Sequence, residues 1–106
     1  MGDSFDLDRG LFGISVAAEL TGVSAQALRG YEDKGLIAPY RTDGGTRRYS
    51  RNDLDRVEQI TTLLAAGVNL AGIAHILELQ AETMRLRDEL DDLRRPPTGP
   101  DHQRRE

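Results

Sequence analysis

The sequence lacks cysteine and tryptophan, and its aromatic residues are limited to three tyrosines and two phenylalanines. Without cysteine there can be no disulfide, no thiolate metal site and no thiol nucleophile. Apolar runs extend for only a few residues, far short of the roughly 20 that a transmembrane helix needs. The N-terminal residues are acidic and lack the basic-then-apolar pattern of a signal peptide. We therefore expect a cytoplasmic protein with a small, mainly helical core and no membrane partner.

Net positive charge is also lacking, except in one stretch of the chain. The formal net charge is -4, but residues 24–51 hold six basic and three acidic side chains. The flanking stretches, residues 1–23 and 52–106, are both net acidic. An island of positive charge indicates an anionic partner, and a phosphate backbone is the commonest one. Charge alone leaves open the alternative of an ordinary solvated surface.

Helix boundary signals divide the chain into four expected helices. Favoured N-cap residues, whose side-chain oxygen accepts a backbone N–H of the first turn, precede them: Ser15, Ser24, Ser50 and Asn69. The first three helices are expected to end at Gly22, Gly35 and Gly67. The serines are predicted to be caps and not nucleophiles. Because no acid–base pair or phosphate-binding glycine loop is present either, we expect no enzyme, no catalytic residue, no cofactor and no metal site.

The first two helices are separated only by "TGVS", which is the spacing of a helix-turn-helix. In that motif the second helix enters the major groove of DNA. Small apolar residues are expected to lock the two helices together: Val16, Ala17, Leu20, Val23 and Leu28. Arginine pairs with guanine and glutamine with adenine, so Gln26 and Arg29, on the outward side of the second helix, are the predicted base-reading residues.

The stretch "RTDGGTRRYS", residues 41–50, reads as a β-hairpin. Either Asp43-Gly44 or Gly44-Gly45 can supply its turn. A hairpin directly after a helix-turn-helix is a wing, which would carry three arginines along the phosphates: Arg41, Arg47 and Arg48. The alternative is an arginine hairpin paired to acidic residues of its own protein.

The third and fourth helices are expected to support the first two through apolar stripes. The stripe of the third helix comprises Leu54, Val57, Ile60 and Leu64, and that of the fourth comprises Leu70, Ile73, Ile76 and Leu77. Beyond them, leucines recur in a heptad pattern with Thr83 between the first two: Leu79, Leu86, Leu90 and Leu93. This pattern predicts either a dimerisation helix or a terminal helix that folds back on its own domain.

The run "ISVAAELTGVSAQALRGYEDKGLIAPYRTDGGTRRYS", continued by "GVNLAGIAHILEL", resembles the N-terminal winged-helix domain of MerR-family transcription regulators over residues 14–93. "RTDGGTRRYS" and "GVNLAGI" look most like the heat-shock repressor (HspR-like) branch. The resemblance implies base contacts by Gln26 and Arg29 and an antiparallel dimer helix. The predicted phosphate contacts are Ser24, Tyr31, Arg41, Arg47, Arg48 and Tyr49. Gly30 stands where many members have an aromatic residue, so one usual backbone contact is expected to be absent.

The predicted fold class is mainly α, a winged helix-turn-helix with a short β-hairpin wing and a C-terminal dimerisation helix. The expected parts are a disordered segment (1–12), the DNA-binding domain (13–79), a coiled-coil helix (80–95) and a disordered tail (96–106). The predicted function is a sequence-specific, homodimeric repressor that binds a palindromic site on double-stranded DNA. The resemblance implies a DnaK-type chaperone as co-repressor. The alternatives are a protein-interaction adapter and a DNA-bending accessory factor.

Overall fold

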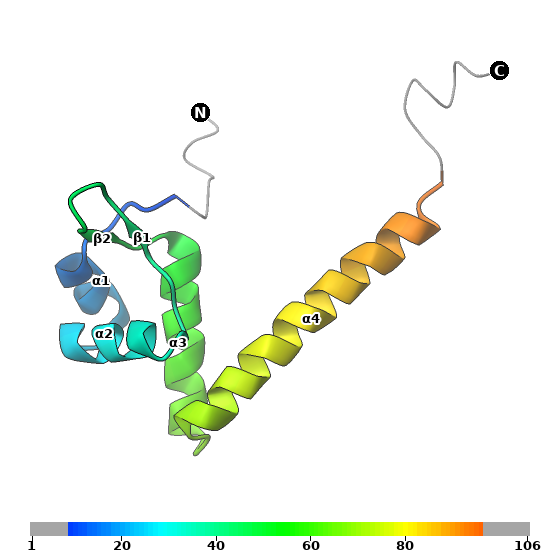
Figure 1. Cartoon of the computed structure of the whole chain (residues 1–106). Helices are drawn as coiled ribbons and strands as arrows, with labels where there is room; N and C mark the ends of the chain where they lie inside the picture. The colour runs from blue at the N-terminus through cyan, green and yellow to red at the C-terminus, as the bar shows by residue number, and fades with distance from the viewer. Residues whose placement is uncertain (1–8, 97–106) are drawn as a thin grey trace. The chain divides into compact units, whose positions relative to one another are not determined.

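The computed structural model describes residues 9–96 and is mainly helical (Figure 1). Its elements, in chain order, are α1 (Ile14–Thr21), α2 (Ala25–Asp33), β1 (Tyr40–Arg41), β2 (Arg47–Arg48), α3 (Arg51–Ala65) and α4 (Leu70–Arg94). The two strands form an antiparallel hairpin. The predicted fold class is confirmed. The chain divides into two compact units, one up to Ala74 and one from His75 onward. The expected tail lies, apart from its first residue, outside the described residues.

Three of the four predicted N-caps are confirmed. The Ser24 hydroxyl accepts the Ala27 N–H at 3.0 Å at the start of α2. Ser50 and Asp53 form a reciprocal capping box at the start of α3. The Asn69 side chain accepts a backbone N–H of the first turn of α4. Local sequence signals therefore place the starts of three helices correctly.

The prediction that Ser15 caps the first helix is wrong. Helix α1 begins at Ile14, and its N-cap is Gly13, which makes no side-chain cap bond. The chain before it is already fixed, because the Phe12 N–H donates to the Tyr49 carbonyl at 3.0 Å and the Tyr49 N–H donates back to the Phe12 carbonyl. Helical turns follow directly, so Ser15 lies inside the first turn. The prediction that all of residues 1–12 are disordered does not fit this pairing either, and residues 1–8 lie outside the described part.

The core of the first unit lies where α1 contacts α2 and α3. Its largest fully buried side chains are Leu28, Tyr49, Val57, Ile60 and Ile73. Ala17 is also fully buried, as expected for the helix-turn-helix. Three predicted core residues are instead exposed: Val16, Leu20 and Leu64. Helix α1 has only eight residues, and its neighbours cover the Ala17 side, so Val16 and Leu20 face solvent one turn apart.

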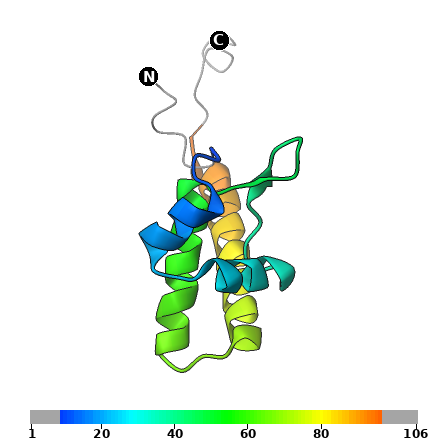
Figure 2. The same cartoon turned by 90° about the vertical axis from the view of Figure 1, so that its left-hand side faces the viewer.

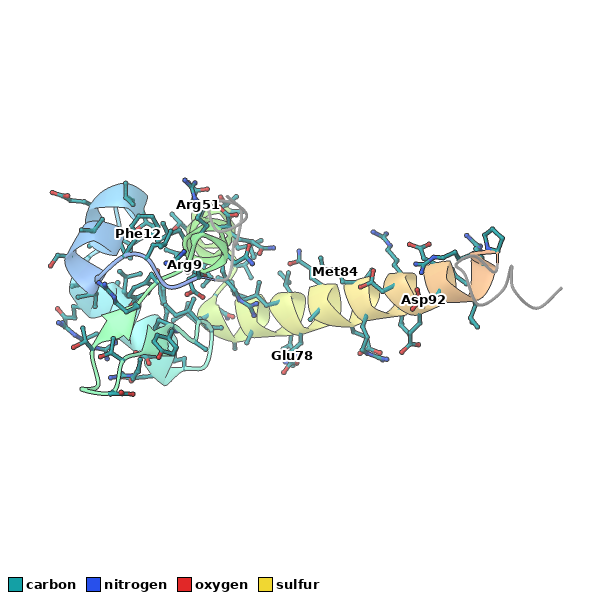
Figure 3. The ribbon with its side chains drawn as sticks, turned by 90° about the horizontal axis from the view of Figure 1, so that it is seen from above. Arg9, Phe12, Arg51, Glu78, Met84 and Asp92 are labelled. Atoms are coloured by element: carbon teal, nitrogen blue, oxygen red, sulfur yellow. The ribbon has the colours of Figure 1, made fainter. Side chains whose placement is uncertain are left out.

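In the second unit, α4 continues without a break across the predicted boundary between residues 79 and 80. The predicted fourth helix and the predicted dimerisation helix are therefore one helix. Every residue from Glu78 to Arg94 is exposed, and Figure 3 shows Glu78 and Met84 projecting from opposite sides of the ribbon. Its charged side chains pair locally, since Arg85 contacts both Glu82 and Glu89. Among residues 9–96, no helix is long and apolar enough to span a membrane.

Candidate nucleic-acid interface

The link between α2 and the wing is fixed by a sharp helix ending. The Leu36 N–H donates to the Tyr31 carbonyl and the Gly35 N–H to the Glu32 carbonyl, both at 2.9 Å. This Schellman ending needs the left-handed backbone of Gly35, whose φ is 77°. The following Leu36 is buried, and its carbonyl accepts the Arg56 Nε–H from α3 at 2.9 Å. The wing is therefore anchored to the helices immediately after α2.

The wing turns at residues 42–46, where its tip projects beyond the helices of this unit (Figure 2). The Gly45 N–H donates to the Thr42 carbonyl at 2.8 Å, and the Thr42 N–H donates to the Thr46 carbonyl at 2.9 Å. Asp43 and Gly44 are thus the central residues, which decides between the two predicted turns. The positive φ falls on the next residue, Gly45, at 88°. A left-handed residue after the turn is typical of three-residue hairpin loops.

The strand register sorts the wing arginines onto two faces. Tyr40 pairs with Arg48, and Arg41 pairs with Arg47. Because successive side chains of a strand point to opposite faces, Arg41 and Arg47 share one face and Arg48 shares the other with Tyr40. The sequence pattern does not distinguish the three arginines. The strand register places them in two different surroundings.

Glu32 of α2 binds both arginines of the first face. Its Oε1 accepts the Arg47 Nε–H at 2.6 Å, and its Oε2 accepts a hydrogen bond from Arg41 Nη2 at 3.1 Å. Arg41 Nη1 also donates to the Gly45 carbonyl at 2.9 Å. The exposed fractions of the side chains are 18% for Glu32, 21% for Arg47 and 45% for Arg41. The alternative of a hairpin paired to acids of its own protein therefore holds for two of the three arginines.

This arrangement changes the protonation equilibria of Glu32 and Arg47. Partial burial alone would raise the pKa of Glu32, but hydrogen bonds from Arg47 and Arg41, together with their charges, lower the pKa below its ordinary value. The Glu32 hydrogen bond raises the pKa of Arg47. Glu32 is thus a carboxylate and Arg47 is a cation at neutral pH. The three side chains together carry one net positive charge.

The predicted base-reading residues and the third wing arginine do not bind an acidic side chain in this way. The side chains of Gln26, Arg29 and Arg48 are exposed, and none of these side chains forms a hydrogen bond or an ion pair with another of residues 9–96. Gln26 and Arg29 are three residues apart in α2, so they lie on the same side of the helix. Their polar groups remain available to a ligand.

The two predicted phosphate contacts that are tyrosines belong to the core. Tyr49 has no exposed surface, and its hydroxyl has no hydrogen-bond partner within the described residues. Burial raises the pKa of Tyr49, which keeps it neutral. A side chain without exposed surface cannot bind a phosphate, so this prediction for Tyr49 is contradicted. Only 9% of Tyr31 is exposed, which leaves its role a prediction. Ser24 is exposed while it caps α2.

Two residues important to this surface were not singled out from the sequence. Glu32 joins residues that lie 9 and 15 positions away, and Phe12 pairs with Tyr49, 37 positions away. The one usable signal for Glu32 is its acidic charge within the basic stretch. For Phe12 the sequence offers no signal, because a single aromatic residue shows no periodicity.

The comparisons with known proteins fit this geometry. Residues 12–80 match the family described as MerR HTH family regulatory protein. The chain is 38% identical over 86 residues to the transcriptional regulator GlnR of Bacillus anthracis, covering 78% of this chain and 67% of that protein. It is 44% identical over 80 residues to HspR of Streptomyces coelicolor, covering 74% of this chain and 53% of that protein.

Solved structures give the same result. HiNmlR, described as a MerR family regulator that lacks the sensor domain and is bound to promoter DNA, has a TM-score of 0.63 at 29% identity, over 76% of this chain and 64% of that one. A MerR family regulator from Bacillus cereus has a TM-score of 0.59 at 30% identity, over 74% of this chain and 65% of that one. The chain therefore belongs to the MerR helix-turn-helix family of DNA-binding transcriptional regulators. It spans about half to two thirds of these relatives.

Proposed function

We propose that this protein is a transcriptional repressor that binds a palindromic operator as a homodimer. The observation that carries the proposal is the exposed side of α2, where Gln26 and Arg29 stand unpaired beside the wing. Their amide and guanidinium groups match the donor and acceptor patterns of adenine and guanine in the major groove. Neither has a partner among residues 9–96, so DNA binding by these groups breaks no internal bond.

The phosphate contacts come from the wing and from the start of α2. Arg48 is the strongest candidate, because it is a cation with no acidic partner among the described residues. Ser24 can donate its hydroxyl proton to a phosphate while its oxygen caps the helix. Arg41 and Arg47 contribute less, because Glu32 already accepts their hydrogen bonds. Tyr31 stays a predicted contact with little exposed surface.

Homodimerisation is assigned to α4. Its exposed leucines follow the predicted heptad pattern: Leu79, Leu86, Leu90 and Leu93. Exposed apolar residues at this spacing leave water only when a partner helix covers them. Two winged domains held together in this way would read two half-sites, which gives the palindrome. The proposed boundaries are residues 13–79 for the DNA-binding domain and 80–95 for the dimerisation part of α4.

The heat-shock branch is supported by the identity with HspR, whose description names a heat shock protein. The identity with GlnR supports a second candidate, a regulator of the GlnR kind. A DnaK-type chaperone as co-repressor stays a prediction from the resemblance. The relatives are transcriptional regulators, and we propose no catalytic role for this chain.

Selection of bound sequences from a random duplex pool tests the proposal. We expect enrichment of one sequence with two inverted half-sites, bound at about 10⁻⁸ to 10⁻¹¹ M near physiological salt. The double variant Gln26→Ala and Arg29→Ala should lose this enrichment, while Arg87→Ala, an exposed arginine of α4, should keep it. A protein-interaction adapter would enrich no sequence. An enriched single half-site would contradict the dimer.

A further inference from the structure

The wing contains a cross-strand pair of like charges. Arg41 and Arg47 lie directly opposite each other in the register of β1 and β2. Like charges at directly opposed positions destabilise a hairpin. Here the carboxylate of Glu32 reaches both guanidinium groups from α2, with contacts of 2.6 and 3.1 Å. The repulsion is therefore compensated by a residue of the helix that also carries Gln26 and Arg29.

We propose that Glu32 withholds Arg41 and Arg47 from the phosphates and thereby weakens the phosphate-dependent part of DNA affinity. This inference rests on the proposed DNA-binding function. Binding to DNA of any sequence depends on how many phosphates are neutralised by basic side chains. An arginine that reaches a phosphate must first give up a charge-assisted hydrogen bond to Glu32, which costs part of the gain. The arginines that have no acidic partner within the protein therefore supply the sequence-independent affinity.

Binding to the operator and binding to unrelated DNA both lose this phosphate-dependent part, because phosphates carry no sequence information. Gln26 and Arg29 are free of Glu32 and contribute only when the correct bases are present. Glu32 thus lowers the affinity for DNA of any sequence and leaves base recognition intact. The share of operator binding that comes from base contacts rises, although the net charge of the three-residue group remains positive.

The test compares the full chain with Glu32→Gln, which keeps the shape of the side chain and removes its charge. Affinity is measured against salt for the selected operator and for an unrelated duplex. For the unrelated duplex, each freed arginine should steepen the slope of log affinity against log salt by about 0.9. Affinity for the unrelated duplex at 0.1 M salt should rise by roughly tenfold per new contact. Affinity for the operator should rise by the same factor, so the ratio of operator to unrelated affinity should stay the same.

Two further variants separate competition for Arg41 from a general charge effect. Glu58→Gln removes an exposed carboxylate of α3 and should change the slope little. Arg41→Gln alone should also change the slope little, because Arg41 is already bound to Glu32. In the Glu32→Gln background, the same Arg41→Gln change should reduce the slope by about 0.9 per domain. This difference between backgrounds would not arise if Glu32 only braced the wing.

The opposite outcomes overturn the inference. If Glu32→Gln lowers both affinities equally and flattens the slope, Glu32 is only a brace for the wing. If the slope is unchanged, Glu32 does not compete with phosphates. Should Glu32→Gln fail to fold, an Arg41→Gln variant of the parent chain that loses a full contact would by itself contradict the proposal. A parent chain that binds no DNA would instead refute the proposed function.

Discussion

The two units treat the same residue type in opposite ways. Leu28 and Leu36 of the winged unit are buried, whereas Leu86 and Leu90 of α4 are exposed. These two leucines of the winged unit belong to its buried core. The leucines of α4 form a periodic stripe of the kind that a partner helix covers in a coiled coil. The winged unit therefore buries these leucines itself, whereas the stripe of α4 is the surface that we propose for dimerisation.

The ion pairs of the two units also differ, because those of α4 are local and those of the winged unit join separate elements. In α4, Arg85 pairs with Glu82 and Glu89, which lie three and four residues away on an exposed helix surface. Such pairs stabilise the helix locally by a few tenths of a kcal/mol each. In the winged unit, Glu32 of α2 joins one residue from each of the two strands to its own helix. Local pairs support the helical state of α4, while the Glu32 contacts fix the wing on α2.

The largest expected effect comes from disrupting the leucine stripe of α4. Replacing Leu86 and Leu90 with Lys places charges in the leucine stripe and should dissociate the dimer. Linking two domains raises affinity for a two-part site by about 10² to 10⁴, and this gain should be lost. Analytical ultracentrifugation should show a monomer, and operator binding should weaken by that factor.

Met84→Lys is the matched control for the double leucine variant, because Met84 is an exposed apolar residue of α4 outside the stripe. It should leave the protein dimeric. The double leucine variant should keep its helicity, since both leucines are exposed and the buried hydrophobic residues extend only to Leu77. A variant that stays dimeric would show that the stripe does not mediate association.

The second-largest expected effect concerns base recognition by Arg29 in the winged unit. Arg29→Ala should cost about 1–3 kcal/mol of binding free energy and relax preference at one position of each half-site. Competition binding with single-base operator variants measures both. Lys34→Ala, which removes an exposed charge at the end of the same helix, should not change base preference. A uniform loss on all sequences would make Arg29 a phosphate contact instead.

Local features of the sequence were sufficient to predict much of this unit. Ser24 and Ser50 act as caps through bonds to residues three positions away, which a sequence pattern can show. The Phe12–Tyr49 pairing and the Glu32 contacts join distant positions, and no local pattern reports them. Likewise, periodicity on an eight-residue helix does not say which side its neighbours cover, so the exposure of Leu20 was missed.

A smaller effect distinguishes the two faces of the wing. Arg48→Ala should reduce the salt slope of binding by about one per domain, hence about two for a symmetric dimer. The loss should be alike on operator and unrelated DNA, because phosphates carry no sequence information. Arg47→Ala should reduce the slope by less, since Glu32 holds that arginine. Equal losses for the two variants would show that the Glu32 bond does not persist on DNA.

The smallest effect concerns the stability of the winged unit alone. Gly30 lies inside α2 without a positive φ, and a Cβ added there meets no atom within 4 Å. Alanine costs about 1 kcal/mol less than glycine in a helix, so Gly30→Ala should raise the free energy of unfolding by up to that amount. Thermal unfolding should then occur about 4–8 °C higher. Gly35→Ala is the control: its φ of 77° disfavours a side chain, so it should destabilise by about 1–2 kcal/mol. A loss of stability in Gly30→Ala would mean that residue 30 of α2 is constrained by more than helix propensity.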